Sequence, residues 1–150
     1  MITIDADKAR KDGWIEAWFA IEALGASADV VEAALKTHVD KLAHEEDVIV
    51  LNKEFKAVEE VKNPPKPLRS GWSQVANATL LAKDLQTLIR LVLMYGPSAI
   101  EIIGPKSKQI NIGEIQNIVN SLAGLLHQFV AAGVGGLVIT PDRGSGTCGR

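Results

Sequence analysis

The chain has 150 residues, the usual size of one globular domain and long enough to bury an apolar core. Apolar residues make up 47% of it and charged residues 23%, as in an ordinary soluble protein. The net charge of -2, from 16 Lys and Arg against 18 Asp and Glu, argues against nucleic-acid binding, which needs a basic surface.

The single cysteine and the first residues bear on the compartment. Cys148 has no partner within the chain, which excludes an intrachain disulfide and a cysteine-based metal site. Residues 1–13 lack the apolar segment of a secretory signal, and no apolar run is long enough to cross a bilayer. We therefore expect a cytoplasmic protein without membrane association, whose polar residues 1–13 form a poorly ordered leader or a loose edge strand.

Residues 14–24, WIEAWFAIEAL, fit two structures. A helix would have an apolar side that includes both tryptophans, and the Ala and Glu content favours it. A strand would place one apolar set on one face: Ile15, Ala17, Phe19, Ile21 and Ala23. Its other face would carry Trp14, Glu16, Trp18, Ala20 and Glu22. We prefer the strand, because a turn and a clear helix follow it, an order that recurs later in the chain.

The next segments predict a helix, a strand and a loop. A helix over residues 28–44 is indicated by apolar side chains three or four apart: Val31, Leu35, Val39 and Leu42. Residues 47–61 predict a long strand bent near Asn52, and its charged later part is typical of an edge strand. Residues 63–70, NPPKPLRS, predict a loop, because proline cannot donate a hydrogen bond to a sheet.

The order strand, helix, strand then recurs. Residues 72–81 are rich in Val, Thr, Ala and Leu, which favours a half-buried strand. Asp84 is a candidate N-cap for the following helix, which Gly96 and Pro97 end. Residues 98–103, SAIEII, predict a short strand.

The last predicted helix opens with a capping-box-like pair, Asn111 and Glu114, and ends near Gly133. Its apolar face is the clearest in the chain: Ile115, Ile118, Val119, Leu122, Leu126, Phe129 and Val130. Residues 135–140 are a candidate terminal strand, and residues 141–150 predict a flexible, glycine-rich tail.

The predicted order is strand, helix, strand, strand, helix, strand, and then the last helix. Two βαβ units with right-handed crossovers and an antiparallel centre give a ferredoxin-like βαββαβ sheet, an α+β fold with an additional long C-terminal helix. We expect one such domain over residues 14–140. The first two helices would cover one sheet face, and the last helix or a dimer partner would cover the other, above Trp14 and Trp18.

The runs YGPSAIEIIGP and NIGEIQNIVNSLAGLLHQF resemble small uncharacterised archaeal proteins of ferredoxin-like type. The resemblance covers the second half of the chain. It implies a fold and a lineage but no activity, and no catalytic residue is carried over from it.

Two groups of polar residues are candidate sites. Glu16, Glu22 and Glu101 would share one sheet face if their strands are neighbours, and clustered carboxylates raise a pKa or bind a cation. Asn120 and His127 lie on the less apolar side of the last helix and could form a polar patch. The competing interpretation is that both groups are ordinary solvated surface.

Known catalytic and cofactor motifs give no further candidates. The three histidines, His38, His44 and His127, lack metal-ligand spacing. No nucleophile elbow or phosphate loop occurs in its required context, so we predict no metal site and no cofactor.

These observations lead to hypotheses of different classes. The preferred one is a non-catalytic ferredoxin-like module that forms a homo-oligomer through its sheet or last helix and senses a small-molecule ligand. The alternative is an enzyme with a site at a subunit interface, which requires the candidate carboxylates or His127 to line a concave pocket. RNA binding on Trp14, Trp18 and Trp72 is the third, but the basic and aromatic signature of such domains is absent.

Overall fold

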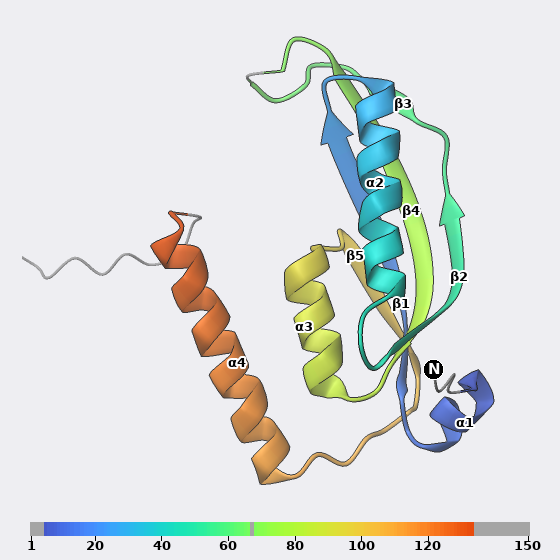
Figure 1. The fold of residues 1–150 in the computed structure, drawn as a ribbon, viewed down its shortest axis with the longest axis vertical. Helices are drawn as coiled ribbons and strands as arrows, with labels where there is room; N and C mark the ends of the chain where they lie inside the picture. The colour runs from blue at the N-terminus through green and yellow to red at the C-terminus, as the bar shows by residue number, and fades with distance from the viewer. Residues whose placement is uncertain (1–4, 67, 134–150) are drawn as a thin grey trace, which may run out of the picture. The chain divides into compact units, whose positions relative to one another are not determined.

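The computed structural model describes residues 5–66 and 68–133. Its elements in chain order (Figure 1) are α1 (Ala6–Lys11), β1 (Ile15–Gly25), α2 (Ala28–Ala43), β2 (Val48–Phe55), β3 (Glu59–Val61), β4 (Gly71–Ala82), α3 (Leu85–Tyr95), β5 (Ala99–Gly104) and α4 (Ile112–Ala131). Contacts divide the chain into two compact units, Met1–Asn111 and Ile112–Arg150. The first unit contains the sheet, and the second contains α4.

The sheet confirms the predicted ferredoxin-like α+β arrangement. Its strand order is β2-β4-β1-β5, the short β3 also pairs with β4, and all pairs are antiparallel. The two halves, β1–α2–β2 and β4–α3–β5, are the two units of a split βαβ fold, with β1 and β4 at the centre. Residues 14–24 are therefore extended and not helical: β1 pairs with β4 from Ile15 opposite Ala82 to Gly25 opposite Trp72.

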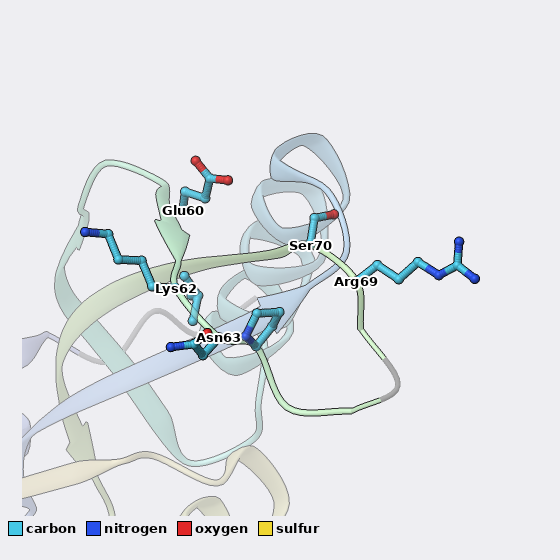
Figure 2. A pocket seen from close by; sticks show the side chains of 7 residues that line it. Glu60, Lys62, Asn63, Arg69 and Ser70 are labelled. Carbon is cyan, nitrogen blue, oxygen red and sulfur yellow. The ribbon is translucent and has the colours of Figure 1, made fainter.

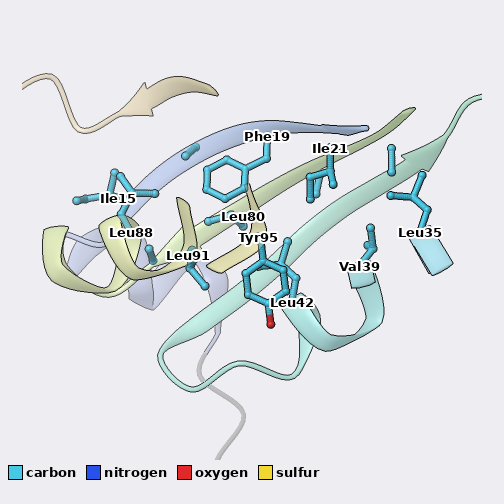
Figure 3. Packing of buried hydrophobic residues seen from close by; sticks show 14 residues of the cluster. Ile15, Phe19, Ile21, Leu35, Val39, Leu42, Leu80, Leu88, Leu91 and Tyr95 are labelled. Atoms are coloured by element: carbon cyan, nitrogen blue, oxygen red, sulfur yellow. The ribbon is translucent and has the colours of Figure 1, made fainter. Parts of the chain in front are cut away.

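Both α2 and α3 pack on one face of the sheet (Figure 3). The cluster between them and the sheet contains Ile15, Phe19 and Ile21 of β1, Leu80 of β4, Leu35, Val39 and Leu42 of α2, and Leu88, Leu91 and Tyr95 of α3. Because strand side chains alternate, the apolar set predicted for β1 points into this core. Burying these side chains supplies the main driving force for folding.

Local signals fix the ends of the two core helices. The Ser27 hydroxyl accepts a hydrogen bond from the Val30 amide at 3.3 Å and caps α2. The Asp84 carboxylate accepts one from the Thr87 amide at 2.8 Å and caps α3. Gly96 ends α3 in the left-handed conformation, with φ of 56°, which a residue with a side chain rarely adopts.

The strand predicted over residues 47–61 is two strands in the structure. β2 ends at Phe55 and β3 begins at Glu59, and both pair with β4. A register shift between Val50 and Asn52 marks a bulge at Leu51. The predicted bend near Asn52 corresponds to this bulge.

Residues 6–11 differ from the poorly ordered leader expected there, because they form α1. The Asp5 carboxylate caps this helix by accepting a hydrogen bond from the Asp7 amide at 3.3 Å. Ala9 is buried with Trp14 and Leu81 in a small cluster on the sheet face opposite α2 and α3. The α1 helix therefore covers Trp14 through Ala9.

The last helix forms close to where the sequence predicts it. α4 starts at Ile112, directly after Asn111, and ends at Ala131, two residues before Gly133. Of the predicted apolar face, Ile118 is buried. The strand predicted for residues 135–140 and the tail predicted for residues 141–150 lie outside the described residues, so the single domain over residues 14–140 stays a prediction.

Candidate functional site

The β5 strand forms one edge of the sheet and exposes three isoleucines. Its inner side pairs with β1, and no strand of the described chain pairs with its outer side. The register sets Ile100 opposite Phe19 and Ile102 opposite Ala17, on the face covered by α2 and α3. These isoleucines are nevertheless 42% and 52% exposed, and Ile103, at a register shift near the strand end, is 51% exposed. Backbone groups and apolar side chains are thus accessible along the same edge.

The opposite edge, β2, differs in the features that prevent strand pairing. The bulge at Leu51 interrupts its register. Asn52, Lys53 and Glu54 are exposed, and Lys53 Nζ lies 3.4 Å from an Asp40 carboxylate oxygen. Charged residues, Lys above all, and bulges are the usual means by which proteins keep an edge strand from pairing with another chain. Between Ala99 and Gly104, β5 has a single charged residue, Glu101.

The candidate carboxylates on the sheet share one face without converging. Glu101 lies opposite Trp18, and Glu16 and Glu22 lie on the same face of β1 as Trp18. Six residues of a strand put Glu16 and Glu22 about 20 Å apart. The Glu16 carboxylate accepts a hydrogen bond from Arg10 Nη2 at 2.7 Å, so its near neighbour is a cation of α1. The three carboxylates therefore lie at separate positions along the sheet face that carries Trp18.

The polar candidates on the last helix are exposed. Asn120 accepts a hydrogen bond from the Gln116 side-chain amide at 3.3 Å, and His127 lies two turns further along α4. Both belong to the second unit.

The three tryptophans lie on different faces, which removes the basis for RNA stacking. Trp14 is buried beside α1, and Trp18 is half-buried on the same face. Trp72 lies four residues before Ala76 on β4 and pairs with Gly25, so it is on the face that α2 and α3 cover. A base-stacking platform needs its aromatic rings on one open face.

A side-chain network joins the C-terminal ends of α2 and α3. The Tyr95 hydroxyl donates to Glu45 Oε1 at 2.5 Å, and Arg90 Nη1 donates to Glu45 Oε2 at 2.9 Å. Arg90 also donates through Nη2 to the Glu46 carbonyl at 3.2 Å. His38 Nε2 lies 3.0 Å from the Tyr95 carbonyl, so this nitrogen carries the proton. No motif signals the network, because Glu45 and Arg90 are far apart in the sequence.

The electrostatics of the network indicate a structural role. The hydrogen bond from Tyr95, followed by Arg90, lowers the pKa of Glu45. Burial, followed by the hydrogen bond to Glu45, raises the pKa of Tyr95 to about 12. Both shifts move the groups away from neutral pH, whereas general acid–base catalysis needs a pKa near the working pH. Glu45 stays ionised and Tyr95 stays protonated, and the pair ties the α2–β2 connection to α3.

A surface pocket of about 540 Å³ lies where β3 leads into the loop before β4 (Figure 2). It is lined by Glu60, Val61, Lys62, Asn63, Pro64, Arg69 and Ser70. In Figure 2 the side chains of Lys62 and Arg69 extend outward on opposite sides. The candidate carboxylates of the sheet and His127 do not line it, so this pocket does not support the enzyme hypothesis.

Two further properties concern the part of the chain that the structure describes. Within residues 5–66 and 68–133, no three His, Cys, Asp or Glu side chains are grouped so that they could hold a metal ion. Within the same ranges, no helix is both long and apolar enough to cross a membrane.

Comparison with known proteins gives a family match. The model of the MJ0538 family matches residues 16–135, which is most of the chain, whereas no curated protein and no solved structure matches it. The match supports the resemblance to a small uncharacterised archaeal-type family, and the ferredoxin-like arrangement rests on the strand order. The chain belongs to the MJ0538 family.

Proposed function

We propose that this member of the MJ0538 family is a non-catalytic module that forms a homodimer by pairing β5 with β5 of a second copy. The observation that supports this is the contrast between the two sheet edges. β2 carries a bulge and charged side chains, whereas β5 exposes three isoleucines beside an edge without a strand partner in the described chain.

Symmetry and charge restrict the register of such a dimer. Two antiparallel copies of β5 are related by a two-fold axis, so the residue on the axis faces itself. An axis at Glu101 would place two carboxylates opposite each other, which destabilises a strand pair. An axis at Ile102 or Ile100 separates the carboxylates and brings isoleucines together. We therefore place the axis at one of these isoleucines.

The exposed area predicts a dimer of modest affinity. Covering the exposed half of one isoleucine contributes roughly 1 kcal/mol. Three such side chains from each copy give roughly 6 kcal/mol, in addition to the new backbone hydrogen bonds, and association itself costs several kcal/mol. We expect a dissociation constant in the micromolar range or weaker, so the oligomeric state should depend on concentration.

The test is sedimentation equilibrium of the full chain and two lysine variants over a wide range of concentration. Ile102→Lys puts a charge at the proposed interface from both copies and should weaken the β5 contact by about 30-fold or more. Asn52→Lys adds the same charge to the exposed β2 edge and should leave association unchanged. Equal association of the two variants would contradict the proposed interface. A chain that is monomeric at millimolar concentration would contradict dimerisation altogether.

For the ligand-sensing part of the proposal, the pocket beside β3 is the candidate site. Its volume is within the range of small-molecule sites, and its lining has two cations, Lys62 and Arg69, against one carboxylate, Glu60. This balance favours a small anion. A thermal-shift screen with phosphate and small dicarboxylates should raise the melting temperature of the chain and not of Arg69→Ala; equal shifts in both proteins would exclude the pocket. A cytoplasmic location stays a prediction from the sequence.

A further inference from the structure

The α4 helix has unusually few charged residues. Its 20 residues include one carboxylate, Glu114, one histidine and neither Lys nor Arg. A helix side that faces water normally carries charged residues. Here large apolar side chains are exposed instead: Ile112 at 79%, Ile115 at 43%, Val119 at 54%, Leu126 at 57% and Phe129 at 37%. Such a surface is expected to be covered in solution.

The exposed side chains follow a coiled-coil repeat. Together with the half-buried Leu122 they are spaced three, four, three, four and three residues apart, which is the spacing of positions a and d in a heptad. We name these six residues the α4 seam: Ile112, Ile115, Val119, Leu122, Leu126 and Phe129. The seam is about 27 Å long at 1.5 Å per residue. Ile118 lies beside the seam and is not one of its residues.

We propose that the α4 seam pairs with the α4 seam of a second copy as an antiparallel two-stranded coiled coil. The positions that flank the seam and normally select partners by charge are uncharged: Gln116, Ile118, Ala123, Leu125 and Val130. Self-pairing therefore brings no like charges together, and the helix offers no charge to a charged partner. The absence of Lys and Arg also disfavours a lipid surface, since interfacial helices use basic residues to bind anionic lipid.

Antiparallel pairing matches the seam residue by residue. A two-fold axis between Asn120 and Ser121 sets Ile112 of one copy opposite Phe129 of the other. The same axis sets Ile115 opposite Leu126, and Val119 opposite Leu122. Every layer is then apolar, and the dipoles of the two helices oppose each other favourably.

This contact is independent of the one proposed for β5, because α4 belongs to the other unit of the chain. The two can therefore be measured separately. Ile102→Lys serves as the background, since it weakens the β5 contact and leaves α4 unchanged. Association in this background that a change in α4 weakens reports on the α4 contact.

The experiment measures self-association of the full chain in the Ile102→Lys background by sedimentation equilibrium. Val119→Asp places a carboxylate in the centre of the seam from both copies and should raise the dissociation constant at least about tenfold. Asn117→Asp adds the same charge to the exposed opposite side of α4 and should have no effect. A monomeric background protein, or equal dissociation constants for the two variants, would overturn the proposal.

A second measurement does not depend on the stability of the aspartate variant. With Cys148→Ser and Ile102→Lys as background, Ile115→Cys and Leu126→Cys should form disulfide-linked dimers under mild oxidation, because the axis sets these positions opposite each other. Ile115→Cys alone should not cross-link, since position 115 of the second copy lies near the other end of the antiparallel helix pair. Cross-linking of the single variant would indicate a parallel pair. Absence of cross-linking in the double variant, with circular dichroism that shows an intact fold, would mean that the seam is covered by something else.

Discussion

Removal of the Tyr95 hydroxyl should weaken the link between α2 and α3 by a predictable amount. Tyr95→Phe removes the hydrogen bond to Glu45 at 2.5 Å and leaves the ring in the core. A hydrogen bond to a charged group stabilises a protein by roughly 1.5–3 kcal/mol. The Glu45 side chain is 20% exposed and keeps Arg90 as a partner, so we expect a smaller loss, about 1 kcal/mol. For a chain of this size, that lowers the melting temperature by about 3 °C.

The contribution of the Tyr95–Glu45 pair to stability should depend on pH. Glu45 has a lowered pKa in the folded state, so its contribution is present above its unfolded value and is lost as pH falls through the folded value. Tyr95 has a pKa raised from 10.0 to about 12, so its contribution is complete below the unfolded value and is lost as pH rises between the two. Stabilisation by the pair is therefore greatest between these limits and declines on both sides.

A double-mutant cycle isolates this interaction. Urea unfolding of the wild type, Tyr95→Phe, Glu45→Gln and the double variant at neutral pH should give a coupling free energy of about 1 kcal/mol. The coupling should weaken at an acid pH below the lowered pKa of Glu45, where the carboxylate is protonated. A coupling free energy that is negligible at neutral pH, or equal at neutral and acid pH, would refute the interpretation that the Tyr95 hydroxyl binds an ionised Glu45.

Two further predictions concern the N-cap of α3 and the buried side of α1. Asp84→Ala removes the N-cap of α3 and should destabilise the chain by about 1 kcal/mol in urea unfolding, whereas Asp29→Ala, in the first turn of α2 but not at its cap, should cost less. Ala9→Asp puts a carboxylate against Trp14 and should shift tryptophan fluorescence to the red with a loss of roughly 2 kcal/mol, while Lys8→Asp on the exposed side of α1 should leave the spectrum unchanged. An unchanged fluorescence spectrum in Ala9→Asp would mean that α1 does not cover Trp14.

The central strands and core helices follow from local patterns. The alternation in residues 14–24 fits both a strand and a helix, and the recurrence of the same order after residue 71 decides between them. Asp84 and Gly96 mark the ends of α3 correctly because capping is a local hydrogen-bond requirement that the residue itself meets.

The remaining features depend on contacts that local patterns do not contain. α1 has six residues and one buried side chain, Ala9, so its hydrophobic signal is too small to recognise in a charged segment. The pairing of Glu45 with Tyr95 and Arg90 arises only when the ends of two helices meet. The apolar face of α4 is visible in the sequence, but the part of it that stays exposed, from Ile112 to Phe129, follows from the structure.

The bulge at Leu51 has a consequence for how far strand addition can proceed. A sheet that accepts strands at both borders can recruit copies without end, which is the route to fibres. Because the β2 border is irregular and charged, each copy can add a strand only at β5. A two-fold contact at β5 occupies that edge in both copies. In the proposed β5 pair, strand addition would then stop at two copies even when the protein is concentrated, and deleting Leu51 would leave only the charged side chains of β2 to oppose further addition.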